Sequence, residues 1–402
     1  MLKIKDKINS FLYNDALEYY IYKIFRTIAF SISNTFVPIY LFSHLGYSIA
    51  ETAIFILIVH FFVIPLIPYT YKIIKFIGVK RTISLHVLGM ALFFYLLQFL
   101  SGNFLLDLPF IILLGIIKSS PKSFYSVADT IFINERILKN KDGFGKSLRV
   151  LQIATIVAGI ISPLIGGILT YFYGFTNFFT ITAIFTAIGI IPLFITRDFK
   201  IDFKVKYVDM LDFIKNKMDR NFKIGVFGLD FSSSILQIIW PIFIIIIVQN
   251  TLDLGYLLSL SAVISIIVSN LIGNHIDKKE FSKMFKLIVN ISSVLFFLRV
   301  VFPNPILLLV TDAINKISNP ILEIPSEKYI YKYLHSFEDK SFVSTSYIFF
   351  FETIYLIGYS VIALYFSIIE AFGLTYNYFV FLFIFIIYGF TILFSKKLAH
   401  IK

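Results

Sequence analysis

The sequence predicts an all-α integral membrane protein whose twelve transmembrane helices form two parallel six-helix repeats. Three observations predict it: long apolar runs, basic residues confined to alternate connections, and a faint internal repeat. The 402-residue chain is 58% hydrophobic and only 15% charged, with a mean hydropathy of +0.85, whereas a soluble domain carries about 25% charged residues. This composition argues against a soluble enzyme, a nucleic-acid-binding protein and a disordered protein.

Twelve apolar runs are separated by short polar segments. All except the ninth are long enough for a helix to cross a hydrocarbon core of ~30 Å. They do not alternate between apolar and polar residues, as membrane-spanning strands would. The expected spans are 22–43, 49–70, 82–100, 108–133, 148–171, 176–195, 223–247, 252–273, 287–302, 305–327, 342–367 and 376–395.

Basic residues mark one side of the membrane. The termini and every second connection hold 30 of the 36 Lys and Arg residues, and the intervening connections hold none. The other six lie inside the runs. Because positively charged loops stay in the cytoplasm, both termini are predicted to be cytoplasmic, which requires an even number of spans.

The connections also divide the chain. We expect a cytoplasmic amphipathic N-terminus (1–21), a six-helix bundle (22–196), a cytoplasmic linker (197–222), a second six-helix bundle (223–396) and a cytoplasmic tail (397–402).

The two predicted bundles share weak sequence similarity at a spacing near 200 residues. Residues 36–40 (FVPIY) parallel residues 239–243 (IWPIF), and Pro121 parallels Pro320. Because each half has an even number of spans, both halves insert with the same orientation. Transport sites in parallel repeats of this kind fall between the halves, near mid-membrane.

The predicted layout resembles the major facilitator superfamily over residues 22–396: twelve spans in two groups of six, cytoplasmic termini and a long central loop. The family carries Gly-x-x-x-Asp-basic between helices 2 and 3, with a weaker copy between helices 8 and 9. The copy here includes Gly273 and Asp277; in the first half, Lys75 replaces the acid and is followed by Gly78 and Arg81. The resemblance implies a role for Gly273, Asp277, Gly78 and Arg81 in conformational change.

The fifth predicted span carries a second pattern similar to this family. Pro163, Gly166 and Gly167 match the Gly-Pro-x-x-Gly-Gly core of its antiporter motif, with Ser162 in place of the first glycine. Small residues let two helix backbones approach closely, and proline removes a backbone hydrogen bond and permits a bend. Tight packing and functional bending both remain open for these residues.

Charged side chains inside the spans are the candidate substrate-binding residues, because they are costly in a bilayer and usually face a bundle interior. Lys118, Lys122, Tyr125 and Asp129 share one face of the fourth span. Lys316 lies at the depth of Lys118 in the tenth span, four residues after Asp312. Such lysines suit an anion-accepting cavity; the alternative is neutralisation by Asp129 and Asp312.

Two further residues complete the expected substrate site. Asn34 is a polar residue of the first span. Trp240, the only tryptophan, is either a cavity wall or an interfacial anchor. Arg299, near the outer end of the ninth span, is expected to extend its charge to the membrane surface.

Asp230 and Glu352 are the predicted proton-coupling residues. Burial disfavours the charged form of a carboxylate, so it can take up and release a proton near neutral pH. The alternative is a fixed ion pair of Asp230 with Arg26, or of Glu352 with Lys316. His60 is either a proton relay or a packing residue.

No P-loop, His-Glu-x-x-His pair or cysteine is present, so we predict no enzyme, catalytic residue, metal or cofactor. We expect a monomeric secondary active transporter in the cell membrane. It would use a proton gradient, contact membrane lipids and a small-molecule substrate, and bind no nucleic acid. The lysines favour an organic anion. Alternatives are drug or metabolite efflux, a membrane enzyme, a receptor and a lipid flippase.

Overall fold

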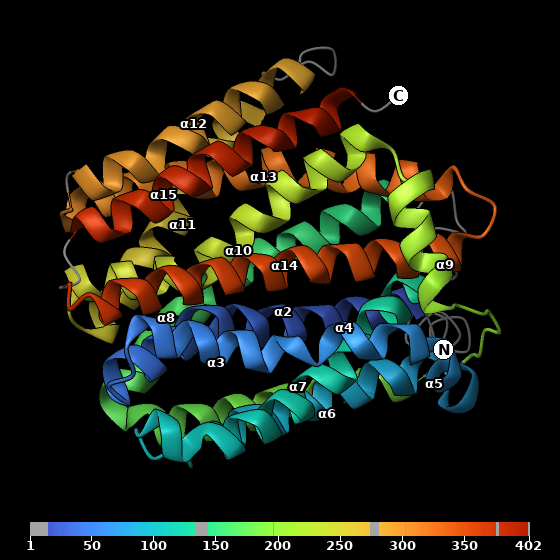
Figure 1. The fold of residues 1–402 in the computed structure, drawn as a ribbon, viewed down its shortest axis with the longest axis horizontal. Helices are drawn as coiled ribbons and strands as arrows, with labels where there is room; N and C mark the ends of the chain where they lie inside the picture. The colour runs from blue at the N-terminus through green and yellow to red at the C-terminus, as the bar shows by residue number, and fades with distance from the viewer. Residues whose placement is uncertain are drawn as a thin grey trace, which may run out of the picture.

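The computed structural model describes residues 15–133, 144–195, 197–273, 281–301, 303–374 and 378–400. Every regular element in these ranges is a helix. Figure 1 shows the long helices lying side by side, with the helices of residues 15–195 (the first half) against those of residues 220–400 (the second half).

The first half begins with α2, which continues into a short π-helix, η1. In the next membrane-length segment the α-helix is interrupted at Phe62 and by the 3-10 helix η2, so the segment is divided into α3, α4, η2 and α5. α8 consists of two helices that meet at a kink at Gly174, where the backbone is not helical and φ is +74°. The bounds are α2 Asp15–Ile39, η1 Tyr40–His44, α3 Ile49–Phe61, α4 Val63–Leu66, η2 Ile67–Tyr69, α5 Thr70–Ile77, α6 Val79–Leu97, α7 Phe104–Phe132, α8 Phe144–Ile188 and η4 Ile191–Phe194.

A segment without regular secondary structure, residues 197–206, leads to two short helices and then to the second half. The bounds are α9 Tyr207–Asp212, η5 Phe213–Lys217, α10 Arg220–Val248, α11 Thr251–Gly273, α12 Phe281–Val301, α13 Pro305–His335, α14 Lys340–Ala371, α15 Tyr378–Leu393 and η6 Phe394–His400.

Side-chain caps fix where the helices start. Ser48 and Glu51 form a reciprocal capping box at α3, which satisfies two backbone N–H groups that a helix leaves unpaired. Asn103, Asp219 and Asn304 each accept one N–H of the first turn of α7, α10 and α13. Such caps stabilise a helix by about 1 kcal/mol, and here they set the ends of long apolar segments.

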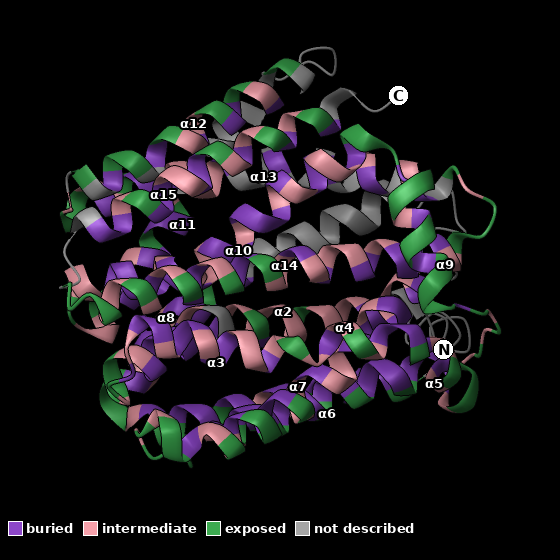
Figure 2. Ribbon diagram, in the orientation of Figure 1, coloured by how far each residue is buried: buried purple, intermediate pink, exposed green. Residues whose placement is uncertain are grey.

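Eight helical stretches of the described residues are long and apolar enough to cross a membrane. Large apolar side chains such as Leu106, Leu364 and Phe390 are exposed on the bundle, while the helix interfaces are buried (Figure 2). In water such exposure would be unfavourable, but it suits a surface that faces lipid. The chain is therefore a multi-pass membrane protein.

The two halves touch mainly along three helix pairs, α8 with α11, α3 with α14, and α2 with α10. At the first, Gly167 and Gly255 allow close backbone contact: a Cβ placed on Gly167 would lie 2.5 Å from the carbonyl oxygen of Thr251. At the second, the rings of His60 and Tyr359 are 4.9 Å apart. These contacts position the cavity described next.

Candidate functional site

A cavity of about 170 Å³ lies between the two halves. Its walls come from α2, α3, α6 and α7 on one side and from α10 and α14 on the other. Its lining includes three cationic side chains, one carboxylate, two histidines and several aromatic rings. These residues are Arg26, Phe30, His60, His86, Met90, Lys118, Lys122, Ser126, Gln237, Phe351, Glu352, Tyr355 and Tyr359.

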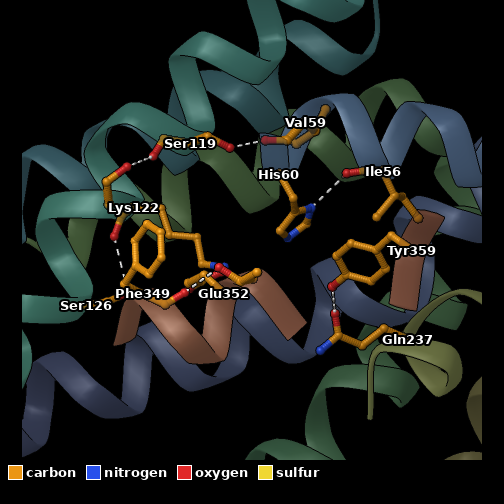
Figure 3. Close-up of polar contacts among 12 residues, drawn as sticks. Ile56, Val59, His60, Ser119, Lys122, Ser126, Gln237, Phe349, Glu352 and Tyr359 are labelled. Carbon is orange, nitrogen blue, oxygen red and sulfur yellow. Dashed lines mark hydrogen bonds and ion pairs between the residues drawn. The ribbon is translucent and has the colours of Figure 1, made fainter. Parts of the chain in front are cut away.

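One ion pair crosses this cavity. The Lys122 ammonium on α7 lies 2.8 Å from a carboxylate oxygen of Glu352 on α14, and Figure 3 shows the two side chains pointing toward each other. Glu352 is buried, whereas the Lys122 side chain is about one-fifth exposed. Glu352 does not pair with Lys316, the partner that the sequence suggested as an alternative; Lys316 pairs with Asp312.

Lys118 lies one helical turn before Lys122 and lines the same cavity. Its ammonium lies 4.6 Å from the centre of the Phe93 ring. Among the described residues, no carboxylate lies within 4.0 Å of this ammonium. A ring face stabilises a cation by about 0.5–2 kcal/mol, but it leaves the charge uncompensated and available to an anion.

Arg26 supplies a third cation. Its guanidinium lies 4.4 Å from the centre of the Tyr125 ring, and its buried Nε has no hydrogen-bond partner in the described part of the chain. The neighbouring carboxylate, Asp129, accepts hydrogen bonds from Lys23 at 2.7 Å and Tyr19 at 2.9 Å. The cavity therefore holds more positive than negative charge.

The polar wall on the α3–α14 side is held by hydrogen bonds. His60 Nδ1 lies 2.9 Å from the Ile56 carbonyl oxygen, and the Tyr359 hydroxyl donates to the Gln237 side chain at 2.6 Å. Figure 3 shows these residues facing the cavity beside Glu352. Their rings and amide are thereby fixed in orientation, which preorganises the wall.

Asp230 on α10 is buried, and its Oδ2 has no hydrogen-bond partner within the described ranges. It does not pair with Arg26, the partner that the sequence suggested as an alternative. An unpaired buried carboxylate is unfavourable when ionised.

Tyr125, Asp312 and Lys316 lie outside the cavity lining. Tyr125 accepts a hydrogen bond from Lys23 at 2.9 Å. Lys316 lies 2.9 Å from Asp312 and 2.7 Å from the Ser261 hydroxyl, within the second half. The structure therefore does not bring Lys118 and Lys316 together at one site.

The predicted exposure of Arg299 is wrong. Its side chain is fully buried: the guanidinium lies 4.0 Å from the centre of the Trp240 ring, and Nε donates to the Thr311 hydroxyl at 2.8 Å. Trp240 lies on α10 and Thr311 on α13, so the sequence around Arg299 in α12 does not indicate that they contact it. Trp240 thus packs on this arginine and is not a lining residue of the cavity.

The fifth-span pattern lies where the halves meet. Gly167 faces Gly255 of α11, the Pro163 carbonyl lies close to Gly255, and Gly166 packs against the Phe36 ring. Small residues here allow close backbone approach. Tight packing therefore accounts for these residues in this structure.

The remaining motif residues are only partly described. Gly78 joins α5 to α6, and Arg81 is exposed on the first turn of α6. Gly273 ends α11, Asp277 lies outside the described residues, and the structure does not describe the Asn34 side chain.

Sequence reasoning missed Arg26 and His86 as lining residues. The signal for Arg26 was available, because it is one of only six basic residues inside the apolar runs. His86 stacks on Tyr125 with ring centres 4.4 Å apart. That contact depends on how α6 and α7 pack. Among the described residues, no cluster of three or more His, Cys, Asp or Glu side chains is arranged to hold a metal.

These features define a class: a polytopic membrane protein whose two helical halves enclose a cation-rich cavity. The profile of the Major Facilitator Superfamily matches residues 20–322, and the chain belongs to this superfamily.

Among solved structures, the fold is similar to the crystal structure of the human organic anion transporter MFSD10 (TETRAN). The TM-score is 0.63 at 11% sequence identity, and the match covers 96% of this chain and 98% of that one. At this identity the likeness shows the fold alone. Comparison with curated proteins gives no match. The family and the fold together support a secondary transporter.

Proposed function

We propose that this protein is a proton-coupled secondary active transporter of a small organic anion, working by alternating access. Twelve spans in two parallel six-helix repeats would rock about the cavity, with both termini in the cytoplasm and the protein in the cell membrane. The bounds of the helices and the alternation of basic connections support this arrangement.

The observation that carries the proposal is the charge of the cavity. Arg26 and Lys118 have no carboxylate partner within the described residues, and only Lys122 is paired, with Glu352. Uncompensated cations in a desolvated site favour an anionic ligand. The solved structure with the similar fold is titled an organic anion transporter, which agrees with this substrate class.

Aromatic rings line the rest of the cavity. Phe30, Phe351, Tyr355 and Tyr359 present apolar faces near the cations. Ligand sites commonly combine apolar walls with a few oriented polar groups. The substrate we propose therefore has a carboxylate or similar anionic group and an apolar or aromatic body.

Proton coupling would operate through Glu352 and Asp230. When Glu352 takes up a proton, Lys122 loses its ionic partner and becomes available to the substrate anion. When Glu352 releases the proton, its carboxylate competes with the substrate for Lys122. The proton and the anion would thus occupy the site together. Asp230, buried without a partner for Oδ2 among the described residues, would carry a proton on the same pathway.

Thermal-shift measurements with organic anions on the detergent-purified protein should first provide a ligand. Its uptake into proteoliposomes would then be measured with and without a pH gradient. Glu352→Gln and Asp230→Asn should lose the dependence on the gradient, while exposed Asp209→Asn on α9 should keep it. Unchanged coupling in both test variants would refute the carboxylate assignment, and no uptake of any bound ligand would refute transport.

A further inference from the structure

A second cavity, of about 430 Å³, lies at the end of the bundle where α6 begins. One wall is the turn between α5 and α6, with Gly78 and Arg81. The other is η4 and the residues that follow it, with Phe194, Arg197, Asp198 and Lys200. The transport site uses none of these residues.

Backbone contacts fix the shape of this cavity. The Asp198 carboxylate accepts the N–H groups of Lys80 at 2.8 Å and Arg81 at 3.1 Å, and Val79 N–H donates to the Phe199 carbonyl at 2.9 Å. Gly78 has φ of +100°, and a Cβ there would collide with the Asp198 carboxylate. The segment after η4 is therefore pinned to the start of α6, so the two walls hold a defined distance.

The cavity presents more positive than negative charge. Arg81, Arg197 and Lys200 are exposed, and no carboxylate lies within 4.0 Å of their charged ends in the described part of the chain. Asp198 is the acid in the lining, but its two oxygens face backbone N–H groups at the positive end of α6. Lys80, by contrast, pairs with buried Glu18 at 3.0 Å.

Apolar side chains flank these cations. Phe194, which lines the cavity, is 63% exposed, and Ile191 on the same short helix is 64% exposed. η4 follows α8 at the end of a membrane-length segment, where acyl chains meet lipid headgroups. Cations beside exposed apolar groups at this depth suit a ligand with a negative head and a hydrocarbon tail.

We propose that this cavity binds an anionic phospholipid. Arg81, Arg197 and Lys200 surround the phosphodiester, and the acyl chains lie along Ile191 and Phe194. Paired arginines suit a phosphate because each guanidinium can donate two parallel hydrogen bonds. The topology in the proposed function would place this site in the cytoplasmic leaflet, and only that placement rests on the proposed function. The site itself requires only that the helices span a membrane.

The test uses the full-length protein in detergent, with palmitoyl-oleoyl phosphatidylglycerol as the probe. Native mass spectrometry and thermal unfolding would follow binding. Phosphatidylglycerol should bind and raise the unfolding temperature, whereas phosphatidylcholine and inorganic phosphate should not. The triple variant Arg81→Ala/Arg197→Ala/Lys200→Ala should bind phosphatidylglycerol at least about tenfold more weakly.

The matched control removes three exposed charges elsewhere in the linker: Lys215→Ala/Lys217→Ala/Arg220→Ala should bind as the wild type does. If the triple test variant does not fold, Arg197→Ala/Lys200→Ala replaces it, because neither side chain has a hydrogen bond to the bundle among those described. The proposal would be overturned if the test variant bound phosphatidylglycerol as tightly as the wild type does. It would also be overturned if phosphatidylcholine or phosphate alone raised the unfolding temperature as much as phosphatidylglycerol does. Binding is measured without transport, so failure of the transport proposal would not affect this result.

Discussion

The Lys122 ammonium and the Glu352 carboxylate lie 2.8 Å apart and join α7 of the first half to α14 of the second. The two residues are 230 positions apart in the chain, and both line the cavity between the halves. Any movement of one half against the other must carry this pair along or break it. The pair thus connects cavity charge with the relative position of the halves.

A double-mutant cycle should detect this coupling. Lys122→Met leaves a buried carboxylate unpaired, and Glu352→Gln leaves an ammonium without its partner, so each should lower the unfolding temperature in detergent. The loss in free energy of unfolding of the double variant should be smaller than the sum of the two single losses, by about 0.5–3 kcal/mol. Additive losses, within about 0.5 kcal/mol, would show that the pair contributes no mutual stabilisation.

Gly167→Ala should destabilise the contact between α8 and α11. The added Cβ would lie 2.5 Å from the Thr251 carbonyl oxygen and 3.0 Å from Gly255 Cα, and overpacking of this kind costs about 1–3 kcal/mol. The unfolding temperature and the rate of uptake should both decrease. Gly159→Ala is the control on the same helix, because its Cβ would meet nothing within 4 Å and alanine favours a helix. Equal effects of the two substitutions would contradict this account of the interface.

Asp198→Ala should lower stability by about 1 kcal/mol, the usual contribution of a helix cap. Asp198→Asn keeps an acceptor oxygen and should lose less. Gly78→Ala should be more damaging than either, because alanine is strained at φ of +100° and its Cβ would meet the Asp198 carboxylate. The unfolding temperatures of the three variants give the order of their stability losses. A Gly78→Ala variant as stable as the wild type would contradict the expected order.

Arg299→Met should change the fluorescence of the protein. Trp240 is the only tryptophan, and the Arg299 guanidinium lies 4.0 Å from its ring centre. Removing this charge should shift the emission maximum and lower the unfolding temperature. Lys286→Met, which removes a charge near the other end of α12, should leave the emission unchanged. An unchanged spectrum in Arg299→Met would show that the arginine does not contact the ring.

The sequence carries most of the information for the helices. Apolar runs mark segments that the structure forms as helices, and caps such as Asn103 and Asn304 lie where two of these helices begin. Lys118, Lys122 and Glu352 were recognisable because charge is rare and costly inside a span. Their depth and helix face follow from spacing along the chain alone.

Partners across helices were not predictable in the same way. Nothing local distinguishes Lys122 from Lys316 as the partner of Glu352, since the choice depends on how α7 and α13 pack against α14. The prediction for Arg299 followed the rule that a charge near a helix end extends to the membrane surface. In the structure, Trp240 and Thr311 provide a buried environment for it instead. Asp198 lies more than 100 residues from the N–H groups that it caps.

The most direct test of alternating access uses the absence of cysteine from the chain. Spin labels on Ser101→Cys/Leu374→Cys would report the distance between halves at one end of the bundle, and labels on Lys72→Cys/Lys340→Cys at the other. Alternating access predicts two populations whose distances change in opposite directions, with their ratio shifted by ligand and in Glu352→Gln. A single distance at both ends under every condition, or distances that lengthen together, would contradict rocking of the two halves about the Lys122–Glu352 cavity.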